Sequence, residues 1–198
     1  MSTNPRTAGQ ARKTTETDVN LRLNLDGTGA STIETGIPFF DHMLTLFSRH
    51  SLIDLEIKVD GDVQVDFHHT VEDTGIVLGE CIREALGDKR GITRYGHAFV
   101  PMDEALSRVV VDLSNRPWLE FHASEDTPSA QNFPFSLVEE FCRALCSNLR
   151  ANLHVEVFYG RDGHHIAESV FKALARAIRV AVTPDARVIG VPSTKELL

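Results

Sequence analysis

Cysteine, tryptophan and tyrosine are scarce in this sequence. Its 198 residues include three cysteines, two tyrosines and one tryptophan. No apolar run approaches the roughly 18 residues of a membrane span. An odd, low cysteine count does not indicate a disulfide framework and favours a reducing compartment. We interpret Cys142 and Cys146, one helical turn apart, as small core residues, because free cysteine is commonly buried.

Positive charge is also in deficit. The 20 lysine and arginine residues stand against 28 aspartate and glutamate residues, so the formal net charge is -8. This balance argues against nucleic acid or an anionic membrane as the partner, but it leaves room for a basic pocket that binds a small anion. Residues 1–13 are polar and lack the apolar stretch of a secretory signal. We expect a cytoplasmic globular protein with a flexible N-terminal tail over residues 1–13.

Histidine, in contrast, is abundant and unevenly placed. The nine histidines include two adjacent pairs, His68 with His69 and His164 with His165. When His68 is aligned with His164, HHTVEDTGIVLGECIREAL lies over HHIAESVFKALARAIRVAV, and both histidines and the following glutamate match. Self-similarity at a fixed offset is the signature of a duplicated unit. The chain is therefore predicted to contain two copies of one structural unit.

The segments before each histidine pair also correspond. Apolar and polar residues alternate, as they do in strands, along residues 19–25, 55–59, 109–113 and 153–157. In the first half the alternation resumes over residues 63–67 after Asp60-Gly61-Asp62, which predicts a hairpin. Helical spacing predicts helices around residues 40–47 and 137–149, and two more that begin at the histidine pairs.

Each half is thus predicted to contain two strands, a helix, a strand, a hairpin strand and a second helix. The halves meet at the polar, glycine-flanked segment 87–91, which is typical of a linker. We assign residues 14–90 to the first half and residues 91–183 to the second, within a single catalytic domain. The fold class is α/β in the broad sense (α+β), with mostly antiparallel sheets and segregated helices.

The spacing within each HHxxE motif separates its potential metal ligands into two directions. His68 and Glu72 are four residues apart and share a helix face, whereas His69 points about 100° away. The second copy repeats the pattern with His164, His165 and Glu168. We expect the i/i+4 pair of one unit to hold one metal ion while the adjacent histidine reaches another. Imidazole with carboxylate ligands suits Mn, Fe, Co, Ni or Zn, and Mn2+ fits this mixed shell.

Residues on the preceding helices are further ligand candidates. His42 lies in FFDHM, 26 residues before His68, and Glu140 lies in VEEFC, 24 residues before His164. These equivalent positions predict a ligand in each half, with a solvated helix-face glutamate as the alternative for Glu140. His50 ends the first long helix, where the helix dipole favours a cation; anion binding is its second interpretation.

With these motifs, the sequence resembles the imidazoleglycerol-phosphate dehydratases, enzymes of histidine biosynthesis. The matching stretches, from about Thr14 onward, are TTETDV, GIPFFDHML, DFHHTVEDTGIVLG, DKRGITRYG, PMDEAL, DLSNRP, LHVEVFYGRDGHHIAESVFKALARA and PSTK. The resemblance implies a duplicated unit in which two sheets enclose the helices, like domain 2 of ribosomal protein S5. It also implies a 24-subunit homo-oligomer built from trimers, with active sites between chains and two Mn2+ ions in each site.

The resemblance assigns roles to individual residues. The implied metal ligands are His42, His68, His69, Glu72, Glu140, His164, His165 and Glu168. The implied substrate contacts are Glu16, near the reacting carbons, and a phosphate-binding group formed by His50, Arg94, Arg116, Ser193 and Lys195. Arginine offers phosphate a two-point fork and lysine a point charge. Residues 184–198 are expected to form a tail that closes on the active site.

Three positions depart from the family pattern. Glu140 stands where many relatives carry histidine, which adds a negative charge and a harder oxygen ligand. Leu46 stands where many relatives carry glutamine, which removes a polar contact with the substrate. Glu196 replaces a common glycine after PSTK, a change that bears on how the tail closes.

The implied reaction converts D-erythro-imidazole glycerol phosphate into imidazole acetol phosphate and water. The carbon–hydrogen bond that breaks is not acidic in the free substrate. The resemblance implies that Lewis-acid catalysis by the metal would supply the activation, through a metal-bound imidazolate and a diazafulvene-like intermediate. Glu16 and Glu168 are the candidates for proton transfer, and Glu16 is favoured because Glu168 is expected to bind metal. Asp103 in PMDEAL is expected to orient a ligand histidine through its other nitrogen.

Two other interpretations use the same residues. A two-metal hydrolase would share the ligands but would attack a phosphate with a metal-bound hydroxide. A non-catalytic, metal-stabilised assembly protein would need neither Glu16 nor Lys195. Ketone formation, phosphate release and the effect of chelation on the oligomer distinguish the three.

Overall fold

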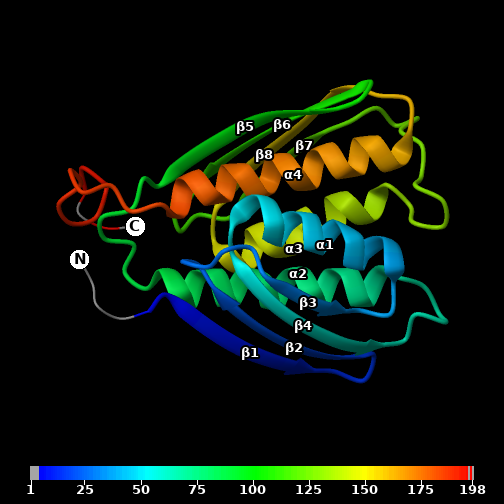
Figure 1. The fold of residues 1–198 in the computed structure, drawn as a ribbon, viewed down its shortest axis with the longest axis horizontal. Helices are drawn as coiled ribbons and strands as arrows, with labels where there is room; N and C mark the ends of the chain where they lie inside the picture. Colours follow the sequence, from blue (N-terminus) through cyan, green and yellow to red (C-terminus); the bar gives the residue numbers. More distant parts are fainter. Residues whose placement is uncertain (1–4, 196, 198) are drawn as a thin grey trace.

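The computed structural model describes residues 5–195 and residue 197. These residues form eight strands and four helices, arranged as two four-stranded sheets with the helices between them (Figure 1). The first half contains β1 (Thr7–Lys13), β2 (Thr17–Asn24), β3 (Ser31–Glu34), α1 (Pro38–Ser51), β4 (Asp54–Gly61) and α2 (His68–Leu86). The second contains β5 (Tyr95–Met102), β6 (Ala105–Asp112), β7 (Trp118–His122), α3 (Ser136–Leu149), β8 (Asn152–Tyr159) and α4 (Gly163–Val182). No described helix is long and apolar enough to cross a membrane.

The two halves have the same topology. The strand order is β1-β2-β4-β3 in one sheet and β5-β6-β8-β7 in the other. In each sheet one pair is parallel, β3 with β4 and β7 with β8, and the other pairs are antiparallel. The predicted duplication, and the prediction of mostly antiparallel sheets that enclose helices, are therefore confirmed.

In each sheet, apolar side chains lie on the face that packs against the helices. Along β2, Val19, Leu21 and Leu23 are buried, while the residues between them are partly or fully exposed. β6 repeats this pattern with Val109 and Val111. Because successive side chains of a strand point to opposite faces, the apolar set of each sheet joins one core with the helices.

Helices of different halves pack against one another. α2 packs along α3, and α1 packs along α4. Two glycines let α2 approach α3 closely: a Cβ at Gly79 would lie 2.6 Å from the Leu145 carbonyl oxygen, and one at Gly75 would lie 2.9 Å from the Ala144 Cβ. Both distances are well below a normal nonbonded contact. Each helix that begins with a histidine pair therefore lies beside the helix of the other half that carries a further ligand candidate.

Phenylalanine rings join three helices at the centre of the core. Phe141 of α3 stacks on Phe171 of α4 with ring centroids 5.1 Å apart, and it meets Phe40 of α1 edge-on at 5.5 Å. Phe141→Ala is expected to lower the free energy of unfolding by about 3–5 kcal/mol, because it removes buried apolar surface and leaves a cavity. Urea denaturation measures the loss. Phe99→Ala is the matched control, since Phe99 is 55% exposed, and an equal loss in both variants would contradict the central position of Phe141.

Two predictions about the first half are wrong. Residues 7–13, predicted to belong to a flexible tail, form β1 and pair with β2. β1 is an edge strand with mostly exposed side chains, so it lacks the apolar alternation that marks a strand. The hairpin strand predicted at residues 63–67 is replaced by a turn, in which Val65 N donates to Asp62 O at 2.7 Å. β4 already pairs with β2 and β3 on its two edges, so it has no free edge for a hairpin partner. Each half instead has a third strand before its first helix.

Candidate metal centre and substrate site

One group of potential metal ligands joins α1 to α4. His42 of α1 and His164 and Glu168 of α4 each offer a ligand atom, and these atoms lie within 4.8 Å of one another; we call them the α1–α4 cluster. His164 Nε2 lies 3.1 Å and His42 Nε2 lies 3.6 Å from Glu168 Oε2. Glu168 is 6% exposed, whereas the His42 side chain is 47% exposed. The cluster therefore has a buried carboxylate at its base and an open side.

A second group joins α2 to α3. His68 and Glu72 of α2 and Glu140 of α3 also offer atoms within 4.8 Å of one another; we call them the α2–α3 cluster. His68 Nε2 lies 3.8 Å from Glu72 Oε2, and all three residues are partly buried. Glu140 thus lies against the histidine–glutamate pair of the other half, as a ligand at this position requires, and not on an isolated helix face.

Both clusters have a donor set that fits a divalent transition metal. Each combines imidazole nitrogen with carboxylate oxygen, and among the described residues no cysteine belongs to either cluster. Such mixed nitrogen and oxygen shells suit first-row metals such as Mn, Fe or Zn. Metal–ligand bonds of about 2.0–2.2 Å hold ligand atoms roughly 3–4.4 Å apart, so small side-chain movements suffice here.

The second histidine of the first pair points away from both clusters. His69 Nδ1 lies 3.0 Å from Asp62 Oδ2, and its Nε2 lies 3.7 Å from Glu16 Oε1. Among the described residues, His69 belongs to neither three-ligand cluster, in line with the expected divergence from His68. The hydrogen bond with Asp62 raises the pKa of His69 above its ordinary value.

The second pair repeats this arrangement. His165 Nδ1 lies 2.7 Å from Glu104 Oε2, and its Nε2 lies 3.9 Å from Asp103 Oδ2. The hydrogen bond raises the pKa of His165; together with two backbone N–H groups, it lowers the pKa of Glu104 to about 2. The expectation that Asp103 orients a ligand histidine through its second nitrogen is therefore wrong. Glu104 makes that contact, because Asp103 sits at the tip of the β5–β6 turn with its side chain 74% exposed.

Glu16 is held by the turn between β1 and β2. Thr14 Oγ1 accepts hydrogen bonds from the backbone N–H groups of Glu16, at 3.1 Å, and of Thr17, at 3.0 Å. The Glu16 carbonyl accepts from Asp62 N at 3.1 Å. The backbone is thus fixed while the carboxylate stays exposed near His69, where it can exchange a proton with a bound molecule.

Basic residues border the α1–α4 cluster. Lys172, one turn after Glu168 on α4, lies 2.5 Å from Glu168 Oε1. Burial alone would raise the pKa of Glu168, but Lys172 and the two histidines of the cluster hold it below its ordinary value. Burial, followed by the positive charges of Lys172 and Arg176, lowers the pKa of His50. Lys172 was not among the predicted site residues, although its i/i+4 spacing from Glu168 is visible in the sequence.

Arg94, a predicted phosphate ligand, is engaged within its own chain. It is 9% exposed, and its guanidinium forms a two-point salt bridge with Asp112 at 2.7 and 3.1 Å. It also donates to the Pro192 carbonyl at 2.8 Å. Arg94 thereby fastens the C-terminal tail to the start of β5. In that tail Lys195 N donates to Ser193 Oγ at 3.2 Å.

The predicted phosphate-binding tail lies far from the clusters of its own chain. Figure 1 shows the starts of the four helices at one end of the molecule and the tail after α4 at the other. α4 has 20 residues, which at 1.5 Å per residue is about 30 Å. Ser193 and Lys195 therefore do not reach their own metal ligand candidates. Arg116 is exposed in the β6–β7 loop, and Glu196 lies outside the described residues.

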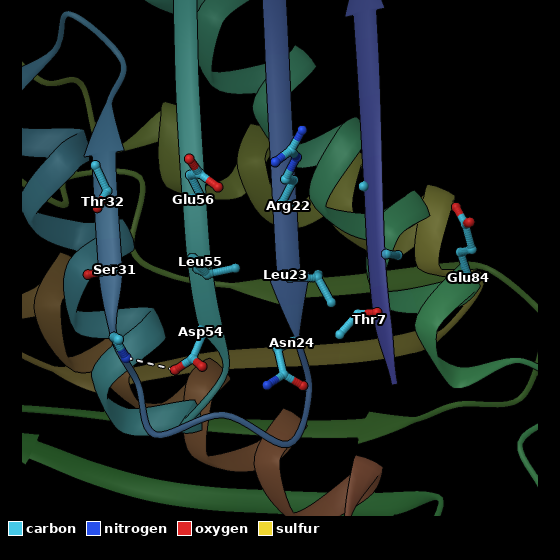
Figure 2. Close-up of a pocket in the computed structure, with 13 residues that line it drawn as sticks. Thr7, Arg22, Leu23, Asn24, Ser31, Thr32, Asp54, Leu55, Glu56 and Glu84 are labelled. Carbon is cyan, nitrogen blue, oxygen red and sulfur yellow. Dashed lines mark hydrogen bonds between the residues drawn. The ribbon is translucent and has the colours of Figure 1, made fainter. Parts of the chain in front are cut away.

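One surface hollow lies away from the ligand candidates, and another opens beside one of them. A hollow of about 780 Å³ lies on the β1-β2-β4-β3 sheet (Figure 2), where Arg22 and Glu56 project from neighbouring strands and Glu84 of α2 stands at one side. None of the ligand candidates lines it. A smaller pocket of about 450 Å³ opens beside His68 and is also lined by Phe67 and residues before α3.

Comparison with known proteins identifies the family. The sequence model described as imidazoleglycerol-phosphate dehydratase matches residues 35–178. The imidazoleglycerol-phosphate dehydratase of Akkermansia muciniphila is 62% identical over 195 residues, which cover 98% of this chain and 100% of the relative. That of Streptococcus sanguinis is 57% identical over 187 residues, 94% of this chain and 96% of the relative.

Solved structures agree. The imidazoleglycerol-phosphate dehydratase of Staphylococcus aureus has a TM-score of 0.82 at 41% identity and covers 90% of this chain and 99% of its own. That of Pyrococcus furiosus, in complex with (S)-C348, has a TM-score of 0.83 at 38% identity and covers 96% of this chain and 100% of its own. With its duplicated fold and its paired histidines, this chain belongs to the imidazoleglycerol-phosphate dehydratase family.

Proposed function

We propose that this chain is a metal-dependent dehydratase that converts D-erythro-imidazole glycerol phosphate into imidazole acetol phosphate in L-histidine biosynthesis. Family membership supports the reaction. The observation that carries the metal dependence is the pair of three-ligand clusters at the starts of the helices. The three cysteines are free and buried, which supports a cytoplasmic enzyme.

The proposed cofactor is Mn2+, with two ions in each active site. The metal, when bound, supplies Lewis-acid activation of the substrate. The α1–α4 and α2–α3 clusters contribute three ligands each. His69 and His165 lie outside the clusters of their own chain, and we assign them to the metal shells of another copy.

The active site is proposed to form between chains of a homo-oligomer of 24 subunits. Two observations support a shared site: the outward direction of His69 and His165, and the distance of about 30 Å between the clusters and the tail, from the length of α4. The phosphate of the substrate is then bound by Arg94, Arg116, Ser193 and Lys195 of another copy, and His50 is the proposed phosphate contact beside the α1–α4 cluster.

Proton transfer is assigned to Glu16. Glu168 is held by Lys172 and by both histidines of its cluster, so it is poorly placed to exchange protons. Glu16 has a fixed backbone and a half-exposed carboxylate beside His69. Asp103 occupies the matching position beside His165 and is the second acidic group facing the site.

Product identity tests the proposed reaction. Purified protein with Mn2+ is expected to form a ketone from imidazole glycerol phosphate without releasing inorganic phosphate. Phosphate release without ketone would indicate the two-metal hydrolase. Dissociation of the oligomer by a chelator, with no turnover before chelation, would indicate the assembly protein.

Metal content is expected to fall as the pH is lowered, and the fall should begin at a higher pH than for ordinary histidine ligands. Carboxylate partners raise the pKa of His69 and His165 above 6.5, so these rings stay protonated to higher pH than ordinary histidines. Metal binding requires the neutral ring, and protons therefore compete more strongly as the pH falls. Metal analysis after dialysis against Mn2+ at stepped pH measures the effect. Full retention at pH 4 would contradict histidine-rich sites.

A further inference from the structure

We propose that Asp62 and Glu104 are positioning residues that fix the ring orientation and the tautomer of His69 and His165. This inference rests on the proposed function. A neutral imidazole carries its proton on one nitrogen only. A carboxylate beside Nδ1 accepts the hydrogen bond from that proton and leaves the lone pair on Nε2 for a metal ion. The contacts are 3.0 Å from Asp62 Oδ2 to His69 Nδ1 and 2.7 Å from Glu104 Oε2 to His165 Nδ1.

In each half a carboxylate contacts Nδ1 of the second histidine, but the two carboxylates come from segments that are not equivalent. Asp62 lies in the loop between β4 and α2, shortly before His69, whereas Glu104 lies in the turn between β5 and β6, 61 residues before His165. Duplication alone would have placed the two carboxylates at matching positions. Their arrival at Nδ1 from different elements points to a requirement at the histidine itself.

Glu104 is itself locked in place. Its Oε1 accepts hydrogen bonds from the backbone N–H groups of Arg161 and Asp162, both at 2.9 Å, which leaves Oε2 for His165. Asp162 caps α4 by accepting from His164 N at 2.7 Å and from His165 N at 3.3 Å. Both the backbone and the ring of His165 are therefore held before any ligand binds.

The Nε2 atoms are left available. Their nearest carboxylate oxygens, on Glu16 and Asp103, lie at 3.7 and 3.9 Å, beyond hydrogen-bond distance. Within the described part of the chain neither Nε2 has a hydrogen-bond partner. Stability alone does not explain the two carboxylate–histidine pairs, because partly exposed ion pairs contribute little to the free energy of folding.

Glu104→Gln separates positioning from stability. The two backbone donors require an oxygen, so the glutamine carbonyl stays with Arg161 N and Asp162 N. Its NH₂ group then faces His165 Nδ1 and donates to it, which moves the ring proton to Nε2. The variant keeps the shape of the site but places the ring proton on the nitrogen that would bind the metal. Loss of an outer hydrogen-bond partner of a metal ligand typically weakens metal affinity about 10–100-fold.

Asp62 predicts a different pattern. Both of its oxygens lie near His69 Nδ1, at 3.0 and 3.2 Å, and no other hydrogen bond to them occurs among the described residues. Asn at this position can rotate its carbonyl toward Nδ1 and keep the tautomer, whereas Ala cannot. Asp62→Asn should therefore bind metal like the unmodified chain, and Asp62→Ala should not.

Mn2+ titration of the intact oligomer, followed by the electron paramagnetic resonance signal of free Mn2+, tests the proposal. The matched control is Glu120→Gln, which changes an exposed glutamate 2.8 Å from His122, outside the site. The unmodified chain is expected to bind two ions per chain. Glu120→Gln and Asp62→Asn should bind two ions with the same affinities as the unmodified chain. Glu104→Gln and Asp62→Ala should each weaken one of the two about 10–100-fold.

Tight binding of two ions by both Glu104→Gln and Asp62→Ala would overturn the positioning role and leave the proposed function intact. Failure of the unmodified chain to bind Mn2+ would overturn the proposed function as well. If Glu104→Gln does not fold by circular dichroism, the contrast between Asp62→Ala and Asp62→Asn decides: equal affinities overturn the proposal, and a selective loss in Asp62→Ala supports it.

Discussion

Glu16→Gln is expected to lower the turnover number by about 10²–10⁴-fold, the usual contribution of a positioned general acid or base. The change removes the ability to take up a proton and preserves the shape of the side chain. The backbone of Glu16 is held by Thr14 and Asp62, so the turn should keep its conformation. Steady-state kinetics on the Mn2+-loaded enzyme measure the loss.

Metal content separates the two roles open to Glu16. If it transfers protons, Glu16→Gln keeps two Mn2+ ions per chain while turnover falls. Glu56→Gln is the control, because Glu56 lies on the outer face of β4 (Figure 2), away from both clusters. Full activity in Glu16→Gln would remove Glu16 from proton transfer, and a parallel loss of metal would make it a ligand.

Co-expression of two inactive variants is expected to restore activity. Glu168→Gln removes the buried carboxylate of the α1–α4 cluster, and Lys195→Ala removes a proposed phosphate ligand at the other end of the molecule. Each variant alone should be nearly inactive. If one chain supplies the cluster and another supplies the tail, about one site in four of a randomly mixed oligomer has both parts intact. The mixture should then recover about a quarter of the unmodified activity.

The control for this experiment uses two lesions in one cluster. His42 and Glu168 meet within a single chain, so co-expression of His42→Ala with Glu168→Gln cannot rebuild an intact α1–α4 cluster. No recovery is expected in that mixture. Equal recovery in both mixtures, or none in either, would contradict a site shared between chains.

The fold was predictable where burial imposes a period. β2, β6 and β8 alternate because each has one face in the core, and the four helices follow from apolar spacing. β1 was not predicted, because an edge strand with exposed side chains has no alternation of apolar and polar residues. Residues 63–67 alternate in the same way but form a turn. They cannot pair with β4, because neighbouring strands already occupy both of its edges.

The site was predictable where its ligands are close in sequence. The i/i+4 spacing predicted two pairs, His68 with Glu72 and His164 with Glu168, and each pair belongs to one of the clusters. Long-range packing decides the rest. The pairing of α1 with α4 and of α2 with α3 depends on the close contact between the halves. No local sequence pattern predicts which helices will pack together.

The most direct test of the central claim, that the two clusters are the metal sites of a dehydratase, is anaerobic metal analysis combined with a dehydration assay on one preparation. Chelated protein is expected to be inactive. Activity should return in proportion to bound Mn2+ and reach its maximum at two ions per chain. Full ketone formation by protein that contains no metal would contradict the account.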